Sequence, residues 1–148
     1  MTFTLEIPVI LNSKFGLLQD NKDYTFNNFG LWLNQITKQS KKESLIRKEK
    51  CEVCNSKDIF EGHHIAGKKH DHRQITACLV CHRWLSDRQK IWDKRWEKEN
   101  SSENLRDAFF FMGLYDILIL KSKKTGNPLY EEYAYSLIED ISKLLKRG

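Results

Sequence analysis

The chain has 148 residues, of which 40% are hydrophobic, 11% aromatic and 30% charged, which excludes a wholly disordered protein and fits one compact domain or a core module with added helices. Lysine and arginine number 25 against 20 aspartates and glutamates, and this net charge of +5 favours a polyanionic partner. The longest apolar run, at 108–115, is stopped by Asp116 and is too short to span a membrane, so we expect no membrane contact.

The first 50 residues are expected to form an N-terminal arm (1–27) followed by a basic helical segment (28–50). Apolar residues alternate at the odd positions 3–9, which is typical of a short strand or an ordered arm. The first ten residues lack the basic start of a secretory signal, so we expect a cytoplasmic setting with reduced cysteines. Apolar spacing over 28–50 predicts one or two helices. The basic side chains there are expected to form a solvated surface, with phosphate contact as the alternative: Lys41, Lys42, Arg47, Lys48 and Lys50.

The remainder of the chain is expected to be a cysteine-rich segment followed by helices. Residues 51–82 are irregular and interrupted by glycines, which predicts short strands and turns around a metal. Residues 85–98 have helical spacing, and residues 100–102 offer a cap for a helix over 108–120 that is apolar nearly all round. That helix must be buried against other elements or a second subunit, so a homodimer through the C-terminal helices stays open. Residues 121–128 predict a basic turn, and residues 129–145 an amphipathic helix; 103–148 form a C-terminal helical extension.

Two CxxC pairs indicate a structural zinc site formed by Cys51, Cys54, Cys78 and Cys81. Four thiolates close a tetrahedron around zinc, whereas a redox motif needs only one pair, and two disulfides are the other alternative. A closed four-thiolate site has no open position for water, so this zinc should hold the fold rather than perform chemistry. Its binding free energy, on the order of 10 kcal/mol or more, would stabilise the folded segment.

All five histidines lie between or directly after the cysteine pairs: His63, His64, His70, His72 and His82. If the cysteines saturate one zinc, the histidines are free to bind a second metal with open positions, leaving one histidine as a base. The alternative is that they are surface histidines of a basic zinc-binding module.

The order and spacing of three segments is specific: Cys51-x-x-Cys54, His63-His64-Ile65-Ala66-Gly67-Lys68 and Cys78-x-x-Cys81-His82-Arg83. Together they resemble the HNH endonucleases, in the four-cysteine, zinc-stapled branch common in phage and bacterial proteins. The resemblance covers about residues 51–90. It implies an α+β fold, in which a treble-clef-like ββα-metal finger at 51–98 is embedded in a mainly helical chain. The strands would lie near 59–65 and 74–77, and the helix would begin near Cys81 or His82.

The resemblance also implies roles for the histidines. His64 matches the general base, His63 the preceding metal ligand, and His82 the second ligand. The family's middle residue, usually Asn, is absent here. By distance from His64 we favour His70 for that place, with His72 as the rival.

The activity implied is metal-dependent hydrolysis of DNA phosphodiester bonds, with nicking or weakly specific cleavage. Only two protein ligands suit Mg²⁺ or Mn²⁺ bound jointly with phosphate, and Ni²⁺ or Zn²⁺ are alternatives. A noncatalytic treble-clef zinc module that binds nucleic acid or a protein partner is the alternative function. The side chains expected to bind DNA are basic: Lys68, Lys69, Arg73, Arg83 and Arg88.

Overall fold

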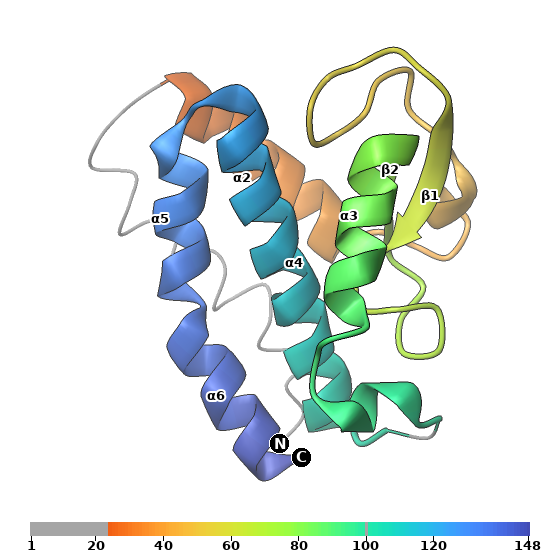
Figure 1. The fold of residues 1–148 in the computed structure, drawn as a ribbon, viewed down its shortest axis with the longest axis vertical. Helices are drawn as coiled ribbons and strands as arrows, with labels where there is room; N and C mark the ends of the chain where they lie inside the picture. The colour runs from red at the N-terminus through yellow and green to blue at the C-terminus, as the bar shows by residue number, and fades with distance from the viewer. Residues whose placement is uncertain (1–23, 100) are drawn as a thin grey trace.

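A computed structural model describes residues 24–99 and 101–148, with side chains from residue 28 onward, so the alternation predicted at 3–9 lies outside the described residues. The fold is α+β, with a small two-stranded antiparallel sheet and mostly helices, as predicted at that level (Figure 1). The elements in chain order are α2 (Tyr24–Thr37), η2 (Glu43–Leu45), β1 (Phe60–His64), β2 (Gln74–Cys78), α3 (Leu79–Gln89), η3 (Lys94–Glu97), α4 (Glu103–Thr125), α5 (Pro128–Ser136) and α6 (Ile138–Arg147).

The two strands and α3 form one continuous unit. β1 pairs with β2 in the register from Phe60 opposite Cys78 to His64 opposite Gln74, which agrees with the predicted strands to within one residue at each end. All five residues of β2 are buried, while β1 is buried at His63. α3 begins at Leu79, directly after β2 and earlier than predicted, so the last residue of the sheet is joined to the helix without a loop.

The long helix α4 is the core of the described chain and lies between α3 and the α5–α6 pair (Figure 1). Its apolar residues are buried within this single chain, among them Phe109, Phe110 and Leu114. Ser102 caps the helix by accepting a hydrogen bond from the Leu105 backbone N–H at 3.2 Å. The predicted cap and the predicted burial of this helix against other elements are therefore confirmed.

Three predicted boundaries are wrong. The turn predicted at 121–128 is helical as far as Thr125, where α4 ends, and the cap that follows is Gly126, whose φ of 73° favours glycine. The helix predicted over 129–145 is two helices that meet at Leu137. The helix predicted over 85–98 ends at Gln89, and a separate 3₁₀ turn starts after the cap Asp93.

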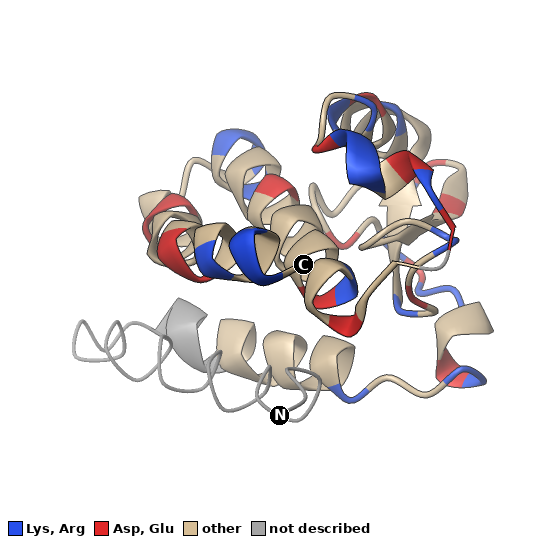
Figure 2. Ribbon diagram, turned by 90° about the horizontal axis from the view of Figure 1, so that it is seen from below, with Lys and Arg blue, Asp and Glu red and all other residues tan. Residues whose placement is uncertain are grey.

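The prediction of one or two helices over 28–50 is confirmed by α2 and the 3₁₀ turn η2. α2 packs Phe29 edge-on against Tyr130 and Tyr133 of α5, with ring centroids 5.3 and 5.1 Å apart. Its sequence has no charged residue, and it appears as an uncharged helix in Figure 2. Among the described helices, none combines the length and apolar character needed to cross a membrane.

Candidate metal centre and active site

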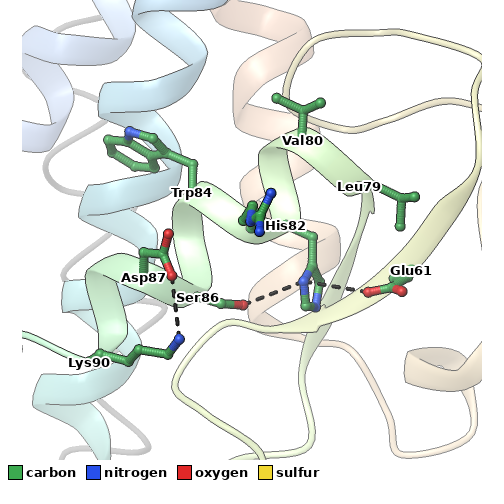
Figure 3. Close-up of a pocket in the computed structure, with 9 residues that line it drawn as sticks. Glu61, Leu79, Val80, His82, Trp84, Ser86, Asp87 and Lys90 are labelled. Carbon is green, nitrogen blue, oxygen red and sulfur yellow. Dashed lines mark hydrogen bonds and ion pairs between the residues drawn. The ribbon is translucent and has the colours of Figure 1, made fainter.

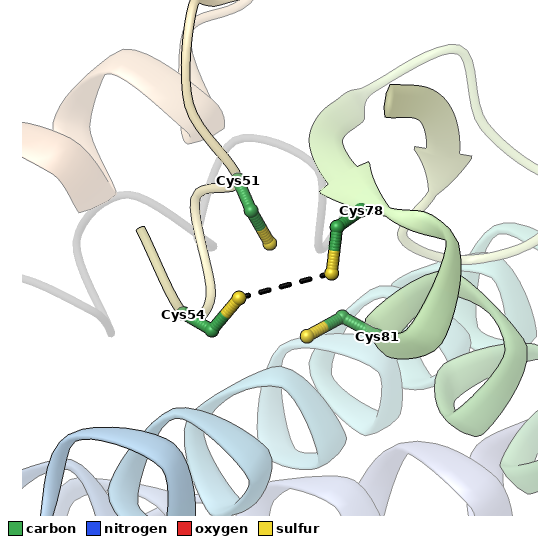
Figure 4. Close-up of side chains that lie close together, drawn as sticks. All are labelled: Cys51, Cys54, Cys78 and Cys81. Atoms are coloured by element: carbon green, nitrogen blue, oxygen red, sulfur yellow. Dashed lines mark hydrogen bonds between the residues drawn. The ribbon is translucent and has the colours of Figure 1, made fainter. Parts of the chain in front are cut away.

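The four cysteine sulfurs converge on one point (Figure 4). Cys51 and Cys54 come from the loop before β1, Cys78 ends β2, and Cys81 lies in the first turn of α3. Their Sγ atoms all lie within 4.8 Å of one another, and those of Cys54 and Cys78 are 3.7 Å apart. Tetrahedral zinc with Zn–S bonds of about 2.3 Å places its sulfurs about 3.8 Å apart, whereas a disulfide needs about 2.05 Å. The four free thiols therefore form a site that fits a metal ion such as zinc.

The loop of the first pair has the tight turn that a chelating CxxC needs. Asn55 has a φ of 63°, and its backbone N–H donates to the Cys51 carbonyl at 2.9 Å. Asparagine tolerates this left-handed conformation better than most residues. The Val53 backbone N–H points at the Cys51 Sγ from 3.4 Å, and a hydrogen bond from Cys81 lowers the pKa of the Cys51 thiol to about 4. Both contacts favour the thiolate, which is the metal-binding form.

A half-buried lysine lies beside this site. Lys121 of α4 donates from Nζ to the carbonyl oxygen of Glu52 at 2.6 Å, inside the first CxxC pair. Burial lowers the pKa of Lys121, while Glu52 and Cys51 oppose that shift. Trp32 of α2 also donates from Nε1 to the Glu52 carboxylate at 3.0 Å. The two contacts connect α2 and α4 to the cysteine loop. Sequence reasoning missed this role because it placed Lys121 in a turn.

His63 of β1 and His82 of α3 lie side by side, with the edge of one ring toward the face of the other. The ring centroids lie 5.3 Å apart and the planes are at 89°. His63 is only 3% exposed, and burial, with the neighbouring His82 and His64, lowers its pKa to about 3. A neutral imidazole keeps a lone pair for a metal. Two imidazole rings brought this close could each offer one nitrogen to a divalent ion, which would keep other positions for water or phosphate.

A groove of about 880 Å³ opens beside His82 (Figure 3). Glu61 points into it from β1, and its Oε2 lies 3.5 Å from Nδ1 of His82. Ser86, one turn along α3, places Oγ 3.4 Å from the same nitrogen. A carboxylate on one imidazole nitrogen favours metal binding by the other. Sequence reasoning missed both residues, although Glu61 lies two positions before His63 and Ser86 four after His82, the same-face spacings of a strand and a helix.

His64 lies in different surroundings from His63, because successive strand side chains point to opposite faces. It is half-buried at the end of β1, and its carbonyl oxygen accepts from Nε2 of Gln89 at 3.0 Å. Burial lowers its pKa, and Lys68 and Arg47 act in the same direction. His64 is therefore a neutral imidazole beside positive charge, which suits a base acting near a phosphate.

The two histidines considered for the middle position lie apart. His70 is 7% exposed, donates from Nε2 to the Trp96 carbonyl at 2.6 Å, and packs on Phe109 with ring centroids 4.8 Å apart. His72 donates from Nε2 to the Gln39 carbonyl at 2.7 Å and is among the groups that act on the pKa of His64. The structure thus places the favoured residue, His70, in the core, and we leave it out of the proposed active site.

Arg73, expected to bind DNA, is instead buried, with 8% of its surface exposed. It pairs with Asp71, donates to the Thr37 carbonyl at 3.2 Å, and lies 3.8 Å above the ring centroid of Phe110. These contacts use its guanidinium within the core, so the DNA-binding assignment of Arg73 is corrected to a structural one.

The other four residues expected to bind DNA lie at the surface. Lys68 is exposed, and Lys69 is exposed and donates to the Glu97 carbonyl at 3.2 Å. Arg83 is exposed and lines the groove beside His82, while Arg88 is half-exposed with Nε 3.5 Å from Asp116. Acidic and basic residues are interspersed over this region (Figure 2), so any contact with phosphate depends on individual side chains rather than on one basic face.

Comparison of the chain with known protein families, with curated proteins and with solved structures found no match. The functional conclusion therefore depends on the residues and their geometry.

Proposed function

We propose that this protein is a metal-dependent endonuclease that hydrolyses DNA phosphodiester bonds, built on a zinc-stapled ββα-metal finger of the HNH type. The observation that carries the proposal is the edge-to-face pair of His63 and His82, held 5.3 Å apart by β1 and α3. A zinc site that is complete with four cysteines has no structural need for this pair. His82 lines a groove whose walls also carry the exposed Arg83, a side chain able to contact a phosphate.

The two metal sites are proposed to have separate tasks. The cysteines would hold zinc permanently, in a cytoplasmic setting that keeps thiols reduced. His63 and His82 would hold a second divalent ion, Mg²⁺ or Mn²⁺, with Ni²⁺ or Zn²⁺ as alternatives. When bound, this ion supplies Lewis-acid stabilisation of negative charge on the phosphate and on the leaving oxygen.

His64 is proposed to act as the general base. Its neutral imidazole accepts a proton from water while the water oxygen bonds to phosphorus and the bond from phosphorus to the 3′ oxygen breaks. The leaving oxygen takes a proton from solvent, so the products are a 5′-phosphate and a 3′-hydroxyl. The positive charge of Lys68, which acts on His64, favours a phosphate at that side of the strand.

The test is conversion of supercoiled plasmid to nicked and linear forms by the zinc-loaded protein with Mg²⁺ or Mn²⁺. We expect His64→Ala to lower the rate by about 10² to 10⁴-fold, the usual contribution of a general base. Lys124→Ala, on the exposed last turn of α4, is the control for purification and handling and should cut at the wild-type rate. Equal cutting by wild type and His64→Ala would refute the base. If wild type binds DNA but cuts neither with Mg²⁺ or Mn²⁺ nor with Ni²⁺ or Zn²⁺ in their place, the noncatalytic zinc module is the better description.

A further inference from the structure

The side chain of Arg47 packs against β1, although Arg47 itself precedes residues 51–90, the segment that resembles the HNH endonucleases. A Cβ built on Gly62 would lie 2.0 Å from Nη2 of Arg47 and 2.4 Å from its Cζ. Gly62 sits within β1 and its φ is not positive, so the strand does not need glycine for its backbone. The absent side chain instead leaves room for the guanidinium, which rests directly against the strand.

This contact places Arg47 beside His64. Residues two apart in a strand share a face, so the group above Gly62 is a neighbour of the His64 side chain. Nη2 of Arg47 donates to Oε1 of Gln74 at 3.2 Å, and Gln74 is the residue opposite His64 in the sheet. The positive charge of Arg47 also acts on His64.

The guanidinium of Arg47 keeps N–H groups that bind no other residue, and its positive charge is not paired with a carboxylate of the described residues. Of its five N–H groups, Nη2 contributes one to Gln74 and Nη1 one to the Ser44 carbonyl at 3.0 Å. Across the described part of the chain, no carboxylate lies within ion-pair distance of Arg47, which is exposed. Three other arginines each lie beside an aspartate: Arg73 with Asp71, Arg88 with Asp116 and Arg95 with Asp93. Arg47 is thus held in place by neutral acceptors and open to an external anion.

We propose that Arg47 is a catalytic residue of the nuclease, binding a nonbridging oxygen of the scissile phosphate on the His64 side of β1. A planar guanidinium matches two phosphate oxygens and stabilises the negative charge that develops on them. The inference rests on the proposed function. It distinguishes Arg47, which would contact the reacting phosphate, from the lysines of the same basic segment, which would stay in solvent.

The first test compares Arg47→Ala with wild type and with Lys124→Ala, an exposed residue of α4 with no assigned role, in single-turnover cleavage of a short duplex. Loss of one such donor typically costs about 10² to 10³-fold in rate, whereas Lys124→Ala should cut at the wild-type rate. Free guanidinium added to Arg47→Ala should restore part of the rate. Arg47→Lys keeps the charge but loses the planar pair of donors, so it should fall between wild type and Arg47→Ala.

The second test moves the guanidinium without removing it. Gly62→Ala places a methyl group 2.0 Å from Nη2 of Arg47 and 2.2 Å from Oε1 of Gln74, and because both atoms are the far ends of flexible side chains the fold should survive. We expect unchanged zinc content and circular dichroism, a rate loss similar to that of Arg47→Ala, and no further loss in the double variant. An additive double variant would refute the shared mechanism.

A binding measurement separates this inference from the proposed function. The dependence of DNA affinity on salt, measured without added divalent ion, should lose about 0.9 of slope in Arg47→Ala, as for one phosphate contact. If wild type cuts and needs His64 but Arg47→Ala cuts equally well with an unchanged slope, the role of Arg47 is refuted and the nuclease stands. If wild type does not cut with any metal, the catalytic role of Arg47 fails together with the proposed function.

Discussion

Gly113 is the point where α4 touches the segment that follows His64. A Cβ on Gly113 would lie 1.8 Å from the carbonyl oxygen of Ile65 and 2.6 Å from its carbonyl carbon. Both atoms belong to the backbone, and Ile65 is fully buried, so neither can rotate away. Restoring an ordinary contact requires α4 and Ile65 to separate by about 1.5 Å, at a packing density that leaves little free space.

Gly113→Ala is therefore expected to destabilise the protein, against the usual trend. In a helix interior, alanine is more favourable than glycine by about 1 kcal/mol. Overpacking of a core costs about 1–3 kcal/mol, and a clash with fixed backbone belongs at the upper end. The net loss should be about 1–2 kcal/mol, which lowers Tm by about 2–8 °C for a chain of this size. Because Ile65 directly follows His64, the shift should also displace His64, and the cleavage rate should fall even at temperatures where the variant is fully folded.

Thermal unfolding of the zinc-loaded variant, followed by circular dichroism, measures this effect. Gly126→Ala is the comparison, because no atom lies within 4 Å of a Cβ built there. It should lose only about 1 kcal/mol, since its φ of 73° is unfavourable for alanine. A Gly113→Ala protein more stable than wild type would refute the close contact between α4 and Ile65.

Three further results are expected. Native mass spectrometry should find one tightly held zinc per chain, and Cys54→Ser should lose it together with cooperative unfolding, whereas a stable metal-free wild type would argue against structural zinc. Burial and then Glu103 raise the pKa of Asp107 to about 7, and its Oδ2 is buried without a hydrogen-bond partner. Because the folded state holds this proton more tightly than the unfolded state, stability is lost as pH rises from about 4 through 7. Asp107→Asn should therefore gain about 1–3 kcal/mol over wild type at pH 8 and almost nothing at pH 4, and equal gains at both would contradict the burial effect. Asn55→Gly should keep the wild-type Tm while Asn55→Val lowers it by several degrees, because valine resists the left-handed conformation; equal Tm values would show that the turn is unstrained.

The cysteine cluster and the two strands beside it were well predicted. The cysteine spacing indicated four convergent thiols, and the resemblance to the HNH endonucleases placed the two strands to within one residue at each end. These features depend on residues close together in the sequence or on a metal site with fixed chemistry. The cap at Ser102 and the apolar helix after it were predictable for the same reason.

The side-chain contacts that could not be predicted depend on packing between residues far apart in the sequence. Arg73 and His70 look like surface residues of a basic loop, yet Phe110 and Phe109 of α4 cover them. Lys121 lies in α4 rather than in a turn, and its ammonium donates to the carbonyl oxygen of Glu52, far away in the sequence. The contact between Arg47 and Gly62 could not be predicted either, because it joins a loop to a strand through the folded backbone.

The most direct measurement is single-turnover cleavage of a defined duplex in ¹⁸O-labelled water, with zinc-loaded wild type and His64→Ala side by side and Mg²⁺ or Mn²⁺ added. Hydrolysis with His64 as base predicts strands ending in a 3′-hydroxyl and in a 5′-phosphate that carries one ¹⁸O, formed at least about 100-fold more slowly by His64→Ala. An uncut duplex with wild type, or equal rates for the two proteins, would contradict a nuclease that depends on His64.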